Sequence, residues 1–396
     1  MNIQPLKLDN NDLKCANCGA HLFYTPGKDT IVCPYCGFEN RIEFTKEQLE
    51  LRDRQNDYFE IELKALKERF PEGKIKVLCP GCGAEVDFEH DTIATKCPYC
   101  GTPLVYKYEQ IPRLVKPQEI IPFRIDQKQA KQLFIRWAKR RFFAPRKFKK
   151  YLIAPSNFMS EYMPYWVFDG HTTTSYTGER GVYYYETETY YENGEQKTRQ
   201  VRRIEWYPVS GEVRVPFTNL TVPGYSSEKM PFFQIETWNF SDTAPYDPRL
   251  LSGYEAKTYS VKLPVAKKVA ERVMEERIKS AIRRDIGGDE QRIHSYSIHY
   301  DQLFYRHDLM PIYYGSYKYK NKIYSFSING QTGAVSGKTP ISFWRVLYVV
   351  LLILILALLA VICFGYNCHF AQFWQDVRSY FNFNFIVMWF RFFSFG

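Results

Sequence analysis

The longest apolar segment of the chain runs from Val346 to Phe364 and contains no charged residue. Its 19 residues would form a helix of about 28 Å, close to the ~30 Å hydrocarbon core of a bilayer. A buried core helix is the alternative. The pattern predicts a transmembrane helix over residues 346–366. Residues 367–396 then form an aromatic tail that lies at the membrane interface or re-enters the bilayer.

Two further segments have the 3.6-residue period of amphipathic helices. In residues 127–143, apolar side chains recur on one face opposite Lys and Arg, and Pro145 ends the pattern. Residues 264–286 show a similar period that Gly287 and Gly288 end. The face of this second helix that we expect to be buried carries Val265, Val269, Val273 and Ile282.

The pattern changes to β-structure over residues 162–215, which are rich in Tyr, Thr and Val. Asn193-Gly194 within it is a strong signal for a two-residue hairpin turn. Such a turn fixes the strand register and brings favourable pairs into opposition. Those pairs are Glu188 with Arg199 and Tyr184 with Arg203.

Residues 292–338 are also β-like, and we expect several short strands there. Turns are predicted at Lys320-Asn321 and at Asn329-Gly330. The fold class predicted for the centre of the chain is therefore α+β, with an antiparallel β-rich sheet and two amphipathic helices.

The formal net charge of +10 is local. Residues 124–150 contain eleven Lys and Arg against the single acid Asp126, so the rest of the chain sums to zero. This distribution argues against a uniformly basic nucleic-acid scaffold. Aromatic residues make up 17% of the chain, which favours β-structure and membrane-facing surfaces.

The basic segment offers a candidate anionic-surface site. Three interpretations stay open: a solvated helix face, contact with anionic lipid, and contact with RNA or DNA that uses Trp137 and Phe142 for stacking. The candidate residues are Lys139, Arg140, Arg141, Arg146, Lys147, Lys149 and Lys150.

Eight of the ten cysteines form a duplicated pattern. Two Cys-x2-Cys pairs separated by fourteen residues recur at an offset of 64, and each second pair has the sequence Cys-Pro-Tyr-Cys-Gly. Zn²⁺ takes four thiolate ligands in a tetrahedron, and each pair supplies two of them from one tight turn. The predicted ligands are Cys15, Cys18, Cys33 and Cys36 for site 1, and Cys79, Cys82, Cys97 and Cys100 for site 2.

Four cysteines for each ion leave no open position, so we expect two structural Zn²⁺ ions. Thiolate ligands need a reducing compartment, which favours a cytoplasmic location for residues 1–340. His21 and His90 lie inside the modules and are interpreted as surface histidines. Neither module has clustered Lys or Arg, so contact with protein is favoured over contact with phosphate.

The sequence contains no constellation that predicts an enzyme. Gly333 to Thr339 resembles a P-loop but has one residue too few between its glycines, and Pro340 follows it where a helix should begin. Histidines 294, 299 and 307 lie on Tyr-rich segments and are interpreted as structural.

The predicted domain order begins with zinc ribbon 1 over residues 1–44. A charged helical spacer over 45–74, with a capping-box pattern at Thr45 and Gln48, leads to zinc ribbon 2 over 75–108. The β-rich α+β domain occupies 117–340 and precedes the transmembrane helix.

These features together resemble a bacterial family of membrane-anchored zinc-ribbon proteins. Its members are described as TFIIB-type zinc ribbon-containing, or as primosomal protein N′ (replication factor Y) helicase-like. Besides the ribbons, the resemblance is carried by residues 121–123, 162–166, 176–179, 309–311 and 329–333, with Gly337 and Pro340.

The resemblance implies PspA-type or SPFH-type proteins of bacterial envelope-stress systems as partners. The duplicated ribbon departs from many relatives. We therefore expect a non-enzymatic, single-pass, cytoplasm-facing adaptor for protein partners at the membrane. The alternative is a nucleic-acid-binding factor related to replication restart, without its own ATPase.

Overall fold

The computed structural model describes residues 6–7, 13–28, 30–54, 56–57, 75–89, 91–106, 114–145, 148, 157–192, 194–225, 238–320 and 322–365. The chain forms two compact units. One contains Met1–Trp137 and Ile153–Lys338, and the other contains Ala138–Leu152 and Thr339–Gly396.

The described elements are as follows. The helices are α1 (Lys46–Asp53), α3 (Gln127–Arg140), α5 (Leu263–Ile286) and α6 (Phe343–Gly365), with 3₁₀ turns η4 (Phe240–Asp242) and η5 (Pro248–Leu251). The strands that precede β10 in the chain are β1 (Leu6–Lys7), β2 (Thr30–Val32), β3 (Glu39–Arg41), β4 (Asn56–Asp57), β5 (Ile75–Leu78), β6 (Glu85–Phe88), β7 (Thr92–Lys96), β8 (Pro103–Val105) and β9 (Glu119–Ile120). The later strands are β10 (Asn157–Glu192), β11 (Glu195–Pro223), β12 (Ala244–Pro245), β13 (Glu255–Lys257), β14 (Glu290–Tyr319), β15 (Lys322–Asn329) and β16 (Val335–Gly337).

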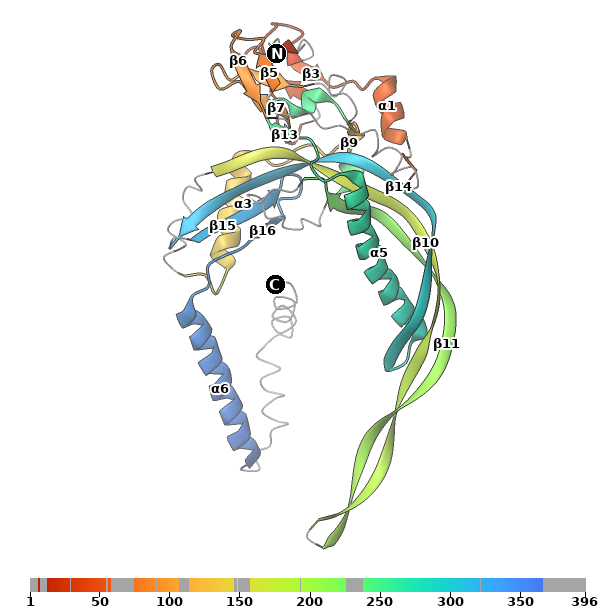
Figure 1. Ribbon diagram of the computed structural model, residues 1–396. Coiled ribbons are helices and arrows are strands. Elements are labelled where there is room, and N and C mark those ends of the chain that lie inside the picture. The colour runs from red at the N-terminus through yellow and green to blue at the C-terminus, as the bar shows by residue number, and fades with distance from the viewer. Residues whose placement is uncertain are drawn as a thin grey trace. The chain divides into compact units, whose positions relative to one another are not determined.

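Three very long strands, β10, β11 and β14, dominate the first unit and curve along their length (Figure 1). β10 is central, antiparallel to both β11 and β14. The expectation of α+β structure with a large, mainly antiparallel sheet is confirmed at this level. The expectation of only short strands over 292–338 is wrong, because β14 is one strand of 30 residues. It continues through Pro311, which pairs with Tyr162 at a position where proline usually ends a strand.

The predicted hairpin register is confirmed. Glu188 lies opposite Arg199 and Tyr184 lies opposite Arg203. The Arg199 guanidinium is 2.9 Å from the Glu188 carboxylate, and Arg203 reaches the same carboxylate at 2.6 Å. β14 pairs with β10 only as far as Gly181, so beyond that point the hairpin continues as a two-stranded ribbon (Figure 1).

Helix α5 packs on the concave side of the long strands (Figure 1). The prediction of its buried face is wrong for the three valines and right for Ile282. Two rows of apolar residues with i, i+4 spacing could each face the sheet. The buried row extends the whole length of the helix, and two small alanines near its start allow close approach. The buried row consists of Leu263, Ala266, Ala270, Met274, Ile278, Ile282 and Ile286. Val265, Val269 and Val273 are exposed.

The N-terminal modules are joined to the central sheet. β7 pairs with β13, which in turn pairs with β10. In the first module the backbone N–H of Tyr24 donates to the carbonyl of Ser252 at 2.9 Å. Residues of both cysteine modules therefore share backbone hydrogen bonds with the rest of the unit.

Helix α1 begins with the predicted capping box. The backbone N–H of Gln48 donates to the Thr45 hydroxyl at 3.3 Å, and the backbone N–H of Thr45 donates to the side-chain oxygen of Gln48 at 2.8 Å. The side chain of Gln118 then donates to the carbonyls of Leu51 and Arg54 near the end of the helix. Residues 58–74, the remainder of the predicted spacer, lie outside the described residues. The helical part of this spacer therefore contacts Gln118, the residue directly before β9.

In the second unit, residues Phe343–Val361 of α6 have a mean hydropathy of 2.7, and none of this segment is buried. The helix is long and apolar enough to cross a membrane. Near its start the N–H of Ser342 donates to the carbonyl of Phe143 at 2.8 Å. The predicted tail over 367–396 lies outside the described residues.

Candidate metal centres and the surfaces around them

The eight cysteines gather into two groups of four sulfur atoms. Within each group all Sγ atoms lie within 4.8 Å of one another, so each group could hold a metal ion. In site 1 the Sγ atoms of Cys15 and Cys36 are 3.7 Å apart, and those of Cys18 and Cys33 are 3.6 Å apart. The corresponding distances in site 2 are 3.6 Å for Cys79 and Cys100 and 3.8 Å for Cys82 and Cys97.

Four turns of the same geometry position these thiols. In each, the glycine after the second cysteine donates its N–H to the carbonyl of the first cysteine at 2.9 to 3.0 Å. The four glycines have φ between 71° and 76°, a conformation that costs other residues free energy. They are Gly19, Gly37, Gly83 and Gly101. The glycines after the cysteine pairs therefore serve the turn that aims both sulfurs inward.

Neighbouring donors lower the pKa of Cys15 and Cys36 in site 1 and of Cys100 in site 2, whereas contacts with the other cysteines raise the pKa of Cys18 and Cys82. Burial raises the pKa of Cys15, but the N–H groups of Cys18 and Asn17 and the amide of Asn40 outweigh this effect and lower it to about 6. The hydroxyl and N–H of Thr102 lower the pKa of Cys100 to about 6. Because thiolates are the form that binds metals, these donors suit a cation.

Each group would surround an ion with protein ligands on all sides. Four thiolates complete a tetrahedron and leave no position for water or substrate, which is the arrangement of structural sites. The buried members (Cys15, Cys33, Cys79 and Cys97) each begin a turn, and the exposed members each end one. His21 is not part of either four-sulfur group, and His90 lies outside the described residues.

The tips of two turns carry exposed tyrosines at matching places in the repeat. Tyr35 is 76% exposed and Tyr99 is 72% exposed, although the cysteine that begins each of these turns is buried. Phe38 adds exposed apolar area next to the first tip. Large exposed aromatic side chains held on rigid turns are typical anchors of protein interfaces.

The candidate anionic-surface site is only partly described. Lys139 and Arg140 are exposed at the end of α3, and Arg141 is half-buried. Helix α3 ends at Arg140, three residues before the predicted end at 143. The other predicted members (Arg146, Lys147, Lys149 and Lys150) lie outside the described residues.

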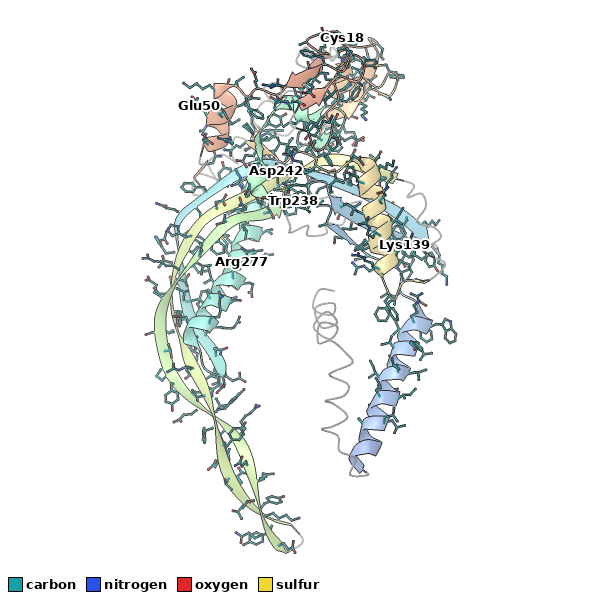
Figure 2. The ribbon with its side chains drawn as sticks, turned by 180° about the vertical axis from the view of Figure 1, so that it is seen from behind. Cys18, Glu50, Lys139, Trp238, Asp242 and Arg277 are labelled. Atoms are coloured by element: carbon teal, nitrogen blue, oxygen red, sulfur yellow. The ribbon has the colours of Figure 1, made fainter. Side chains whose placement is uncertain are left out.

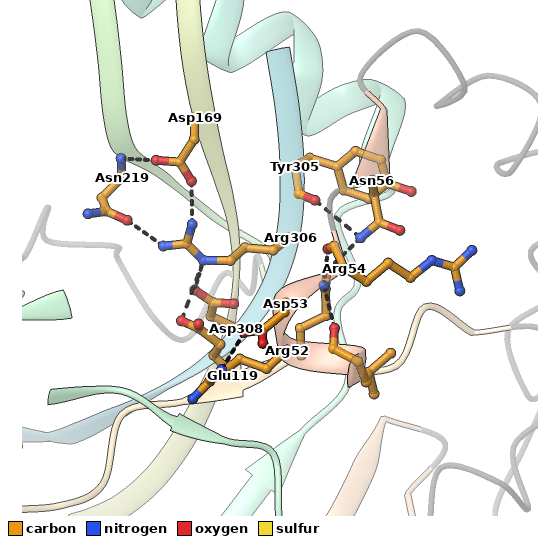
Figure 3. Close-up of polar contacts among 12 residues, drawn as sticks. Arg52, Asp53, Arg54, Asn56, Glu119, Asp169, Asn219, Tyr305, Arg306 and Asp308 are labelled. Atoms are coloured by element: carbon orange, nitrogen blue, oxygen red, sulfur yellow. Dashed lines mark hydrogen bonds and ion pairs between the residues drawn. The ribbon is translucent and has the colours of Figure 1, made fainter. Parts of the chain in front are cut away.

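Sequence reasoning missed a half-buried charge network centred on Arg306 of β14 (Figure 3). Its guanidinium is 2.8 Å from Asp308 and 3.6 Å from Glu119, and it also pairs with Asp169 and Asn219. Burial raises the pKa of Asp308 to about 8, with Arg306 opposing the shift. The network joins β9, β10, β11 and β14. Its members are far apart in the sequence, so no local motif could have revealed it.

Comparison with known proteins gives one distant relative. No family model and no solved structure matches the chain. The chain is 25% identical over 340 residues to a protein of Bacillus subtilis (strain 168) that is described as uncharacterized protein YdjG. The match covers 84% of this chain and 91% of the relative, so the two proteins correspond over most of their lengths.

Proposed function

We propose that the chain is a zinc protein of the bacterial membrane that acts as a cytoplasm-facing adaptor for protein partners and is not itself an enzyme. The Sγ–Sγ distances of 3.6 to 3.8 Å support a tetrahedral four-thiolate metal site, and zinc is the ion that we propose for it. A regular tetrahedron with Zn–S bonds of about 2.3 Å has edges of about 3.8 Å. The two ions are structural because every ligand position belongs to a cysteine.

Helix α6 anchors the protein in a single pass. Its Phe343–Val361 segment is apolar and unburied, as a lipid-facing helix would be. Zinc thiolates are stable in a reducing compartment, which supports a cytoplasmic location for residues 1–340. The metal sites and the anchor together support a protein that works at the inner membrane surface.

The adaptor role depends mainly on one observation, the paired exposure of Tyr35 and Tyr99 at the turn tips. Two zinc-stiffened turns that each present an aromatic ring form a preorganised contact surface for protein. The family resemblance implies PspA-type or SPFH-type membrane-stress proteins as the partners.

Affinity capture from membranes tests the proposal. The full chain with Tyr35→Ala and Tyr99→Ala is compared with wild type and with a matched control, Tyr185→Ala and Tyr191→Ala, in which exposed tyrosines of the β10–β11 hairpin are changed. We expect the turn variant to lose specific protein partners and the control to keep them. Equal capture by all three chains contradicts the adaptor role of the ribbons. Salt-dependent DNA binding by the full chain would favour the replication-restart alternative.

A further inference from the structure

The outward face of α5 is an apolar stripe with no partner in the described part of the chain. Val265, Val269 and Val273 are 54%, 39% and 36% exposed. Their i, i+4, i+8 spacing aligns them over about 12 Å of the helix surface. Aliphatic side chains in an exposed row at helical spacing are the pattern of a surface that receives another element.

Arginines continue this face toward the C-terminal end of α5. Arg272, Arg277 and Arg284 are exposed, and no carboxylate of the described residues lies within 4.0 Å of them. Figure 2 labels Arg277 on this helix. The arginine cluster therefore carries positive charge that these residues leave uncompensated.

The acidic residues nearby are already engaged. Lys279 lies 2.9 Å from the Glu275 carboxylate and 3.2 Å from that of Glu276. The hydroxyl of Tyr176 donates to Asp285 at 2.6 Å. The ion pairs with Lys279 reduce the ability of Glu275 and Glu276 to neutralise the arginines.

The arginines and the end of the valine stripe open onto a groove. The groove has a volume of about 710 Å³ and lies between α5 and β11. β11 contributes Val215 and Pro216, and α5 contributes Val273, Ser280 and the three arginines, with Glu276 beside them. An apolar strip with cationic groups along it complements an acidic amphipathic helix.

We infer that the α5–β11 groove binds an acidic amphipathic helix of a protein partner. Apolar side chains of that helix lie on the valine stripe, and its carboxylates pair with Arg272, Arg277 and Arg284. The inference rests on the proposed adaptor function and names the chemistry of the partner.

The position of the groove suits a single added element. Helix α5 lies on the concave side of the curved strands β10, β11 and β14 (Figure 1), and the groove is bounded by α5 on one side and by Val215 and Pro216 of β11 on the other. An amphipathic helix recognised by a groove lies between two such walls.

A peptide titration tests the charge pairing. The probe is a synthetic 21-residue helix with leucines on one face and glutamates beside them, titrated by fluorescence anisotropy against the full chain in detergent micelles. We expect Arg272→Glu, Arg277→Glu and Arg284→Glu together to weaken binding at least tenfold. A matched control with three charge reversals on α3 (Lys128→Glu, Lys131→Glu and Arg136→Glu) keeps wild-type affinity. Equal binding by both variants, or displacement of the peptide by short-chain phosphatidylglycerol, overturns the inference.

Photo-crosslinking identifies the natural occupant. A photoreactive residue at Val269, in the full chain in its native membrane, should form an adduct with a protein segment of net negative charge. This adduct should be absent when the three arginines of the groove are changed to glutamate. A photoreactive residue at the exposed Ile323 is the control. A lipid adduct, a nucleic-acid adduct or no adduct at Val269 overturns the inference. If capture depends on Tyr35 and Tyr99 but not on the arginines, the adaptor proposal stands and the groove assignment fails.

Discussion

Glu161 of β10 is a carboxyl group enclosed at the junction between the central sheet and the second cysteine module. It is only 1% exposed, and β10 pairs there with β13. Burial raises the pKa of Glu161 to about 7, while the Tyr314 hydroxyl and the Lys257 cation oppose the shift only in part. The acids Glu255 and Asp91 raise it further.

The raised pKa has a defined effect on stability. The folded chain keeps the Glu161 proton at pH values where the unfolded chain, with a pKa near 4.5, has lost it. Stability therefore falls as the pH rises from about 4.5 to about 7 and stays lower above that range. At 1.36 kcal/mol for each pH unit, the loss is about 3 kcal/mol at pH 8.5 and under about 1 kcal/mol at pH 5.

Glu161→Gln removes the ionisable group and retains its size. We expect the variant to exceed wild type in free energy of unfolding by about 3 kcal/mol at pH 8.5, with most of the gain gone at pH 5. Urea unfolding of the full chain in micelles at both pH values measures the difference. Glu212→Gln, an exposed change on β11, is the control and should show no such pH-dependent gain. The reasoning is refuted if Glu161→Gln brings no gain at pH 8.5, or the same gain at both pH values.

Three other outcomes are expected. Zinc analysis by mass spectrometry should find two equivalents in the full chain and about one in Cys33→Ser, because the two four-sulfur groups are separate; loss of both would contradict independent sites. Gly170→Ala should lower the unfolding midpoint more than Gly287→Ala does. Both glycines have positive φ, but an added Cβ would lie 1.8 Å from the Gln302 carbonyl oxygen at Gly170 and would contact none of the described residues at Gly287. The Gly287 change should cost about 1–2 kcal/mol, and equal effects would argue against the clash. Ile278→Ala should cost about 2–5 kcal/mol and speed amide exchange in α5, and an unchanged exchange rate would contradict the packing described.

Local signals predicted local structure well. The register of the hairpin from Glu192 back to Gly170 followed from the predicted two-residue turn, because such a loop determines the pairs on both arms as far as the first bulge, which lies between Phe168 and Gly170. The cysteine groups followed from spacing, because each Cys-x2-Cys turn carries its own geometry. In both cases the information lies within a few residues.

Features that depend on tertiary pairing were not predicted. β14 continues through Pro311 because it pairs with β10 along most of its length, and periodicity alone does not reveal that neighbour. The buried face of α5 was ambiguous because Val269 and Ala270 belong to adjacent rows, and only the sheet decides between them. The network around Arg306 unites residues that are distant in the chain.

The pairing of β7 with β13 makes the second cysteine module part of the large sheet. Cys97, a predicted ligand of site 2, directly follows the last residue of β7, and β13 lies between β7 and β10. Deletion of the module would leave β13 as an outer strand open to pairing with other molecules. If zinc fills site 2 as proposed, we expect loss of the ion to weaken this protection and to raise self-association of the sheet, and the module cannot be deleted as an independent appendage.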